Sequence, residues 1–311
     1  MKGYQELREN AAWINLSGRG EIVATGEDRA RLLHAMSTND IQGLGEGQGC
    51  YVFFLNAQGR ILADANILNL GDSLLTDTEP ETRNKVFAHI DKFIIADDVT
   101  LTDETENLAV VGVEGTHSLE KLQQMGIPLP AADYNFVPWG QRFVAKISAT
   151  GLPGYRIYLP STELPALVSE LESAGINEAD SATVETVRLE NGKPRYGADI
   201  TERYLSQETS QMHALSFSKG CYLGQEIVER VRSRAQIHRM LSPVRIQTQS
   251  PPPPGTKLRT EEKDVGEITS SAFSPAYNEV VALAYVRAEQ MEARNEMVLA
   301  GSEPAIRAYL P

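Results

Sequence analysis

Residues 218–234 read SKGCYLGQEIVERVRSR and contain one of only two cysteines in a chain of 311 residues. Cys221 follows a Lys-Gly pair and precedes Gly224, after which the spacing of apolar residues predicts a helix. A thiol becomes nucleophilic or metal-binding as the thiolate, a form that a nearby cation or a helix amino terminus favours. Lys219 and the predicted helix start therefore make Cys221 a candidate reactive residue. The alternative is a small buried apolar side chain, the commonest role of a free cysteine.

The second cysteine, Cys50, stands between Gly49 and Tyr51 at an expected strand start, and we predict that it packs in the core. Two cysteines so far apart are a poor disulfide framework, which favours a reducing cytoplasm. Five histidines and no second cysteine near Cys221 argue against a four-ligand zinc site. The sequence therefore predicts a cytoplasmic protein with one notable thiol.

The net charge of −13 argues against a dedicated nucleic-acid-binding protein, so an RNA-binding module is the least favoured alternative. A basic row nevertheless follows Lys219, and it suits a small anionic ligand or an acidic partner; a solvated surface is the alternative. Its arginines are Arg230, Arg232, Arg234, Arg239 and Arg245. No apolar run reaches the roughly 18 to 20 residues of a membrane span, and the first residues lack the apolar core of a secretory signal. We expect neither a nucleic-acid nor a membrane partner.

Hydrophobic periodicity and turn residues predict an α+β protein with four consecutive segments. Residues 1–106 form an α+β domain, with a helix over 3–16 and a hairpin around the Asn-Ala-Gln-Gly turn at 56–59. Residues 107–181 read as strand, helix, two strands and helix, a ferredoxin-like unit. Residues 182–240 form a returning segment between the ferredoxin-like unit and the barrel, and they contain the quoted motif. Residues 241–311 hold several short strands, which predict a small β-barrel, with SPPPPG turning the chain between two of them.

The octapeptide KGCYLGQE at 219–226 resembles the KGCYxGQE signature of the YgfZ-type folate-binding proteins. These proteins are relatives of the glycine-cleavage T-protein (aminomethyltransferase) and of mitochondrial iron–sulfur assembly factors. RLENGKPRYG at 188–197 is similar to the family's R-x-E-x-G-x-P-R-x-G block, and segments 38–40 and 58–64 resemble its amino-terminal landmarks. Segments 265–270 and 282–286 resemble its barrel strands, so the resemblance spans nearly the whole chain.

The resemblance implies three domains around a central hole that holds tetrahydrofolate or a derivative, with a barrel at the carboxyl end. It also implies support of iron–sulfur cluster assembly or repair, including the maturation of tRNA-modifying enzymes, with iron–sulfur client or carrier proteins as partners. A transient iron–sulfur cluster is the second implied cofactor. The alternative function is a tetrahydrofolate-dependent aminomethyltransferase, and whether the protein is a turnover enzyme stays open.

Within this resemblance, Cys221 is expected to act as a thiolate that ligates a cluster iron transiently or forms a mixed disulfide with a partner. The residues expected to contact folate or its anionic groups are Lys219, Tyr222, Gln225, Glu226, Arg188, Arg195, Asn39, Asp64 and Arg232.

The chain departs from the T-protein pattern in one strand. Where that pattern has two acidic residues, this chain has Leu152-Pro153 and Arg156. A carboxylate accepts hydrogen bonds from the pterin ring, whereas a guanidinium only donates. The pterin contacts are therefore expected to differ from those of the T-protein. Asp77 and Glu79, at the end of an earlier strand, are interpreted as turn residues.

Overall fold

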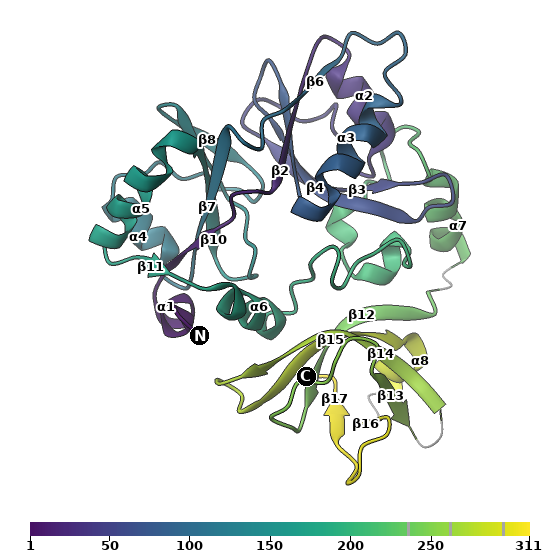
Figure 1. The fold of residues 1–311 in the computed structure, drawn as a ribbon. Coiled ribbons are helices and arrows are strands. Elements are labelled where there is room, and N and C mark those ends of the chain that lie inside the picture. The colour runs from purple at the N-terminus through teal and green to yellow at the C-terminus, as the bar shows by residue number, and fades with distance from the viewer. Residues whose placement is uncertain (235–236, 261–262, 294–295) are drawn as a thin grey trace.

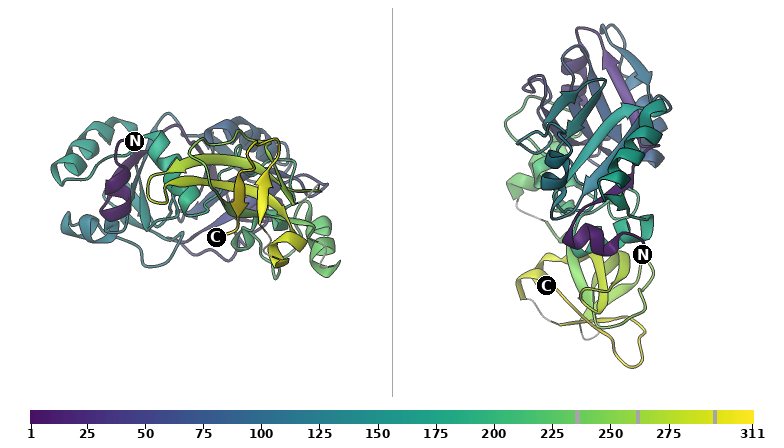
Figure 2. Two further views of the ribbon diagram at one scale, coloured as in Figure 1. Left: turned by 90° about the horizontal axis from the view of Figure 1, so that it is seen from below. Right: turned by 90° about the vertical axis from the view of Figure 1, so that its left-hand side faces the viewer.

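The structure is a computed structural model that describes residues 1–234, 237–260, 263–293 and 296–311, without the side chain of Arg234. Two bodies of sheet and helices stand side by side, and a barrel lies below them (Figure 1). The right-hand view in Figure 2 shows a long molecule with the barrel at one end. This arrangement confirms the predicted α+β class and the carboxyl-terminal barrel.

The first body is a five-stranded sheet in the order β3-β4-β5-β2-β6. Its elements are β2 (Gly20–Thr25), α2 (Arg29–Met36), β3 (Gly49–Leu55), β4 (Ile61–Asn69), β5 (Leu74–Thr78), the 3-10 turn η1 (Pro80–Thr82), α3 (Arg83–Asp91) and β6 (Thr100–Asp103). The predicted hairpin is β3 and β4, whose turn closes because the Asn56 side chain accepts from the backbone N–H groups of Gln58 and Arg60. Apolar side chains of α2 and α3 pack on the sheet to form the first core.

The second body is a six-stranded sheet in the order β11-β1-β7-β10-β9-β8. Its strands are β1 (Ala12–Asn15), β7 (Leu108–Glu114), β8 (Phe136–Trp139), β9 (Arg142–Ala145), β10 (Gly154–Pro160) and β11 (Asn177–Glu178). Its helices are α4 (Ser118–Gln124), the 3-10 turn η2 (Ser161–Glu163) and α5 (Leu164–Ser173).

The predicted helix over 3–16 is wrong beyond its first turns. The helix α1 (Tyr4–Glu9) is short, and the following residues form β1, which pairs with β7 and with β11. Tertiary strand pairing buries Ala12 and Trp13 and overrides the local helical pattern. The second sheet therefore draws a strand from the first 106 residues as well as from 107–181.

The two sheets touch through a shared apolar cluster. Leu68 and Leu75 of the first sheet pack with Val110, Ala145 and Tyr158 of the second. Removal of such large apolar side chains from water stabilises the junction by about 1.5–3 kcal/mol for each fully buried one. This junction holds the facing strands β4, β5 and β10 in place.

The returning segment and the barrel complete the chain. The segment comprises α6 (Ser181–Glu190), the 3-10 turns η3 (Ser206–Thr209) and η4 (Met212–Ala214), and α7 (Gln225–Arg234). The barrel closes in the order β12-β15-β14-β13-β16-β17, and closure leaves no free sheet edge. Its elements are β12 (Arg239–Ile246), β13 (Lys257–Thr260), β14 (Lys263–Ser274), β15 (Glu279–Arg287), α8 (Ala288–Ala293), β16 (Met297–Leu299) and β17 (Arg307–Tyr309).

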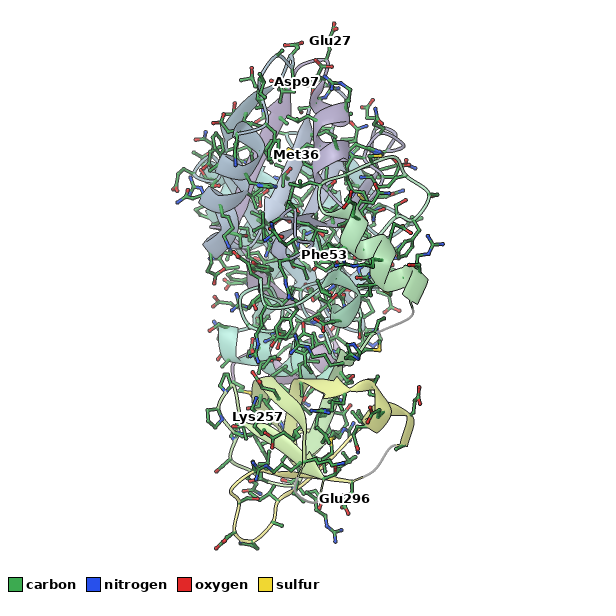
Figure 3. The ribbon with its side chains drawn as sticks, turned by 90° about the vertical axis from the view of Figure 1, so that its right-hand side faces the viewer. Glu27, Met36, Phe53, Asp97, Lys257 and Glu296 are labelled. Atoms are coloured by element: carbon green, nitrogen blue, oxygen red, sulfur yellow. The ribbon has the colours of Figure 1, made fainter. Side chains whose placement is uncertain are left out.

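The helix α6 packs on β14 and β15 and so connects the upper bodies to the barrel. Figure 3 shows Glu27 and Asp97 at the end farthest from the barrel, and Lys257 and Glu296 within it. The prolines of 250–254 turn the chain between β12 and β13, as predicted. None of the helices in the described ranges has the length and apolar character needed to cross a membrane.

Candidate functional site

A cavity of about 590 Å³ lies where the two sheets meet the returning segment. Side chains of β1, β4, β10 and α6, and of the loop that follows α6, line it. Three of the predicted folate-binding residues are among them: Asp64, Arg188 and Arg195. The cavity occupies the position that the resemblance implies for a central hole, and its volume is that of a typical small-molecule site.

Asp64 is a buried carboxyl group on the cavity wall whose pKa is raised. It lies on β4 with 7% exposure, and its carboxylate accepts a hydrogen bond of 2.6 Å from the Tyr51 hydroxyl. Burial and then the negative charge of Glu79 raise the pKa of Asp64 to about 6. A carboxyl group with a pKa close to neutrality can accept or release a proton under cellular conditions. Asp64 is therefore suited both to bind hydrogen-bond donors and to transfer protons.

A buried ion network stands behind this wall and involves Asp77, which is fully buried on β5. Its carboxylate accepts from Arg19, from Arg156 at 2.5 Å and from the Tyr158 hydroxyl at 2.6 Å. Burial alone would raise the pKa of Asp77, but the charges of the two arginines outweigh it and hold the pKa below 3.8. The interpretation of Asp77 as a turn residue is wrong, because it is the central acceptor between β5 and β10.

Glu79 takes part in the same network and also lines the cavity. It pairs with Arg19 and, at 3.4 Å, with Arg195. These two ion pairs lower its pKa against the opposing effect of burial. Glu79 therefore contributes to the cavity wall, beyond the turn that the sequence predicts.

The predicted anion-binding residues Arg188 and Arg195 differ in how many of their hydrogen-bond donors already have partners within the protein. Arg188, at 2% exposure, donates to both oxygens of Glu185, to Asp199 at 2.7 Å and to the Lys193 carbonyl at 3.0 Å. Most of the N–H donors of its guanidinium therefore bond within α6 and to the loop that follows, and they stabilise that loop. Arg195 is 40% exposed and makes two longer ion pairs, so it retains donors for a ligand.

The motif that contains Cys221 lies against the first body, outside the set of residues that line the cavity. The Lys219 ammonium donates to three backbone carbonyls at the end of α2, those of His34 at 2.5 Å, Ser37 at 2.7 Å and Asn39 at 2.6 Å. An ammonium has three N–H donors, so these bonds use all of them. In this structure Lys219 acts as a clamp for the loop.

The other residues of the motif also shape the loop. Gly224 has φ +84°, and a Cβ there would lie 2.7 Å from the Asn56 carbonyl of the hairpin turn. Tyr222 is buried at 7% exposure, and its backbone N–H donates to the Gln225 side chain at 3.3 Å. Helix α7 begins at Gln225, as predicted, directly after the left-handed glycine. Gly224, Tyr222 and Gln225 are therefore explained by the conformation and packing of the loop.

Cys221 differs from its neighbours because it is an exposed, free thiol. Cys50 is partly buried against the first core, and burial raises the pKa of its thiol to about 12. Packing explains Cys50, as predicted, whereas Cys221 gains nothing from packing at an exposed position. The expectation that Cys221 is reactive remains a prediction.

The remaining predicted residues do not converge on the cavity. The Asn39 amide donates to the carbonyls of Tyr51 at 3.0 Å and His213 at 2.9 Å, and so supports the tyrosine that bonds to Asp64. Glu226 is exposed on α7. Arg232 lies over the Phe217 ring and 3.5 Å from Glu229, on the outer side of α7. The side chain of Arg234 lies outside the described residues.

Sequence reasoning missed several residues of the cavity wall. Tyr51, Asn66 and Lys193 line it beside Asp64. Arg156, which the sequence marked as a departure from the T-protein pattern, lines it from β10. One signal was available: Asp64 and Asn66 are polar residues two positions apart in an otherwise apolar strand, so both lie on the same face. Asn66 is also the cross-strand partner of Tyr51, which assigns the tyrosine to that face.

Potential metal ligands do not gather in the described part of the chain. There, no group of three or more His, Cys, Asp or Glu residues is arranged to hold a metal ion. A protein-bound iron–sulfur cluster normally takes about four cysteine ligands. The donor set around Cys221 does not fit a resident cluster.

Comparisons with known proteins cover nearly the whole chain. Residues 2–219 match the GCVT N-terminal domain, and residues 239–306 match the glycine cleavage T-protein C-terminal barrel domain. An aminomethyltransferase of Rubrobacter xylanophilus is 28% identical over 297 residues, which cover 92% of this chain and 78% of that protein. A putative chloroplastic transferase of Arabidopsis thaliana is 23% identical, over 96% of this chain and 70% of its own.

Among solved structures, the glycine cleavage system aminomethyltransferase T of Bartonella henselae has a TM-score of 0.90 to this chain. The two are 21% identical, and the match covers 99% of this chain and 87% of that one. This likeness shows that the fold is shared along the chain, barrel included.

Proposed function

Because the chain belongs to the glycine-cleavage T-protein family, we propose that its central cavity binds tetrahydrofolate or a derivative of it. The observation that carries this proposal is the cavity itself, with buried Asp64 on its wall. A carboxylate and the nearby Asn66 amide can accept hydrogen bonds from the donor edge of a pterin. Cationic side chains on the same wall can pair with the glutamate carboxylates of the ligand.

Calorimetric titration with 5-formyltetrahydrofolate, a stable reduced folate, tests this proposal. Replacement of Asp64 by Ala should weaken binding about tenfold to a hundredfold, since hydrogen bonds to a charged group contribute about 1.5–3 kcal/mol. Asp72→Ala, on the loop between β4 and β5 and outside the cavity lining, is the matched control. Absence of binding to the unmodified protein would reject the proposal.

We further propose that the protein acts as a YgfZ-type factor that supports iron–sulfur cluster assembly or repair, including in tRNA-modifying enzymes. The exposed thiol of Cys221, on a loop clamped by Lys219, supports this role because a partner protein can reach it. Since the local donor set does not fit a resident cluster, any cluster is the cargo of a client protein. An exposed reduced thiol also suits the cytoplasm, the compartment that we propose.

Complementation of cells that lack the protein tests the role of the thiol. The Cys221→Ala variant should fail to restore the activity of cluster-dependent enzymes, while Cys50→Ala, the matched control, should restore it. Normal activity of all such enzymes in the deficient cells would refute the proposal.

Aminomethyl transfer is the second candidate function, and Asp64 is the observation that favours it. A carboxyl group with a pKa of about 6 at the folate site can exchange protons with a ligand at neutral pH. The Rubrobacter relative is named an aminomethyltransferase. The test supplies tetrahydrofolate and an aminomethylated carrier protein; transfer moves the methylene carbon to the folate and releases ammonia. Methylene-tetrahydrofolate above background, lost in Asp64→Asn, would support this candidate over the first.

A further inference from the structure

The central cavity presents two cationic side chains with unused hydrogen-bond donors, Lys193 and Arg156. Lys193 lines the cavity and is partly buried, yet its ammonium has no hydrogen bond or ion pair with any residue in the described ranges. Burial and then the positive charge of Arg156 lower its pKa. The carboxylates of Glu114 and Asp64 act on this pKa in the opposite sense, and Lys193 and Arg156 both line the same cavity.

Arg156 is the second cationic side chain on this wall that has a hydrogen-bond donor without a partner. It is 4% exposed, and its Nη1 donates to Asp77 while its Nε has no hydrogen-bond partner among the described residues. Asp77 also accepts from Arg19, which pairs in addition with Glu79, so Arg156 shares its one ion-pair partner in the described ranges. Arg156 thus keeps hydrogen-bond donors that a ligand could satisfy.

The neighbouring Arg188 cannot take this role as readily. Its donors already serve Glu185, Asp199 and the Lys193 carbonyl. Besides the half-exposed Arg195, unused capacity for anion binding on this wall therefore lies in the more deeply buried Arg156 and Lys193.

Resting on the folate binding proposed above, we propose that Arg156 and Lys193 form a subsite for a carboxylate of the ligand, supplied by the glutamate tail of the folate. A carboxylate is attracted to both cations, whereas the neutral carbonyl of a pterin carries no net charge to offset theirs. A guanidinium and an ammonium provide short, charge-assisted hydrogen bonds to its oxygens. The arginine that departs from the T-protein pattern thereby gains a role in ligand recognition.

Calorimetric titration with three ligands tests the subsite: 5-formyltetrahydrofolate, 6-methyltetrahydropterin without the tail, and p-aminobenzoylglutamate without the pterin. Lys193→Gln should weaken binding of the two glutamate-bearing ligands about tenfold to a hundredfold and leave the pterin unaffected. Arg156→Lys, which keeps a positive charge beside Asp77 and so preserves the fold, should show the same selectivity with a smaller loss. Lys146→Gln is the matched control, because Lys146 pairs with Asp133 outside the cavity lining.

The outcomes separate this inference from the proposed function. If the unmodified protein binds the folate and both substitutions leave its affinity unchanged, the subsite is refuted and folate binding stands. An equal loss for the tail-free pterin also refutes the subsite.

If the unmodified protein binds none of the three ligands, the folate proposal fails and a labelling experiment decides the subsite. Lys193 is then acylated with acetic anhydride in the presence or absence of glutarate, and modification is measured by mass spectrometry relative to Lys146. Protection of Lys193 would support a carboxylate subsite with another source of the carboxylate, and no protection would refute it.

Discussion

Replacement of a buried aspartate by asparagine should raise the free energy of unfolding at Asp64 and lower it at Asp77. Asp64 has a folded-state pKa of about 6 against an ordinary 3.8, so folding makes its ionised form less favourable. The difference corresponds to about 3 kcal/mol of lost stability at pH 7. Asp64→Asn removes the charge and keeps an oxygen that accepts from the Tyr51 hydroxyl. The free energy of unfolding at pH 7 should therefore rise, by up to about 3 kcal/mol.

The sign of the pH dependence follows from the raised pKa. Between about pH 4 and pH 6 the folded protein holds a proton at Asp64 that the unfolded chain releases, so stability falls as pH rises through this window. Below about pH 4 the carboxyl group is protonated in both states, and the advantage of Asp64→Asn should largely disappear. If Asp64 contacts the ligand, the more stable variant should also bind folate more weakly.

Asp77→Asn is the matched comparison. Asp77 is fully buried and ion-paired with Arg19 and Arg156. Its replacement leaves Arg156 without an ion-pair partner among the described residues and Arg19 with Glu79 alone. Breaking a buried ion pair in this way costs about 3–5 kcal/mol. Urea unfolding followed by circular dichroism at pH 7 and pH 4 measures both variants. If Asp64→Asn destabilises the protein at pH 7, or if its effect is independent of pH, the reasoning is refuted.

Three further variants test the loop that carries Cys221. Cys221→Ala should change the free energy of unfolding by less than about 0.5 kcal/mol, because the side chain is exposed. In the unmodified protein, iodoacetamide at pH 7 should label Cys221 before Cys50, whose thiol has a pKa of about 12; mass spectrometry of the two peptides checks this. Lys219→Met should cost about 2 kcal/mol through its lost bonds to three carbonyls and should speed proteolysis of the loop; an unchanged cleavage rate would contradict the clamp. Gly224→Ala should cost about 1–3 kcal/mol by urea unfolding, since φ is +84° and the added Cβ would meet the Asn56 carbonyl; a neutral effect would mean that the hairpin turn moves aside.

Local patterns were sufficient for much of the fold. The turn Asn-Ala-Gln-Gly at 56–59 joins β3 and β4, Gly224 precedes α7, and the short strands of the last segment close into a barrel. In each case the signal lies within a few residues, in turn chemistry or in the period of apolar side chains. The motifs along the chain likewise indicated the T-protein family, which the matches over 2–219 and 239–306 confirm, whereas the YgfZ-type assignment carried by the octapeptide at 219–226 stays a proposal.

The same local patterns failed where a distant segment decided the outcome. Residues 12–15 continue a helical pattern, yet β7 and β11 recruit them as the strand β1. Lys219 resembles an activating neighbour of Cys221 in sequence, yet its ammonium bonds to the His34 carbonyl, 185 positions away. Both outcomes depend on pairing partners that no sequence window contains.

The sequence by itself determined the α+β class, the barrel and the T-protein family, because these depend on local periodicity and on short motifs spread along the chain. Only the tertiary structure decided which side chains share the cavity. Its wall combines residues of β1, β4, β10 and α6, and its charge balance depends on pairs such as Asp77 and Arg156, 79 positions apart. Burial and the nearest opposite charge set the behaviour of an ionisable group, and both arise only when distant segments pack together.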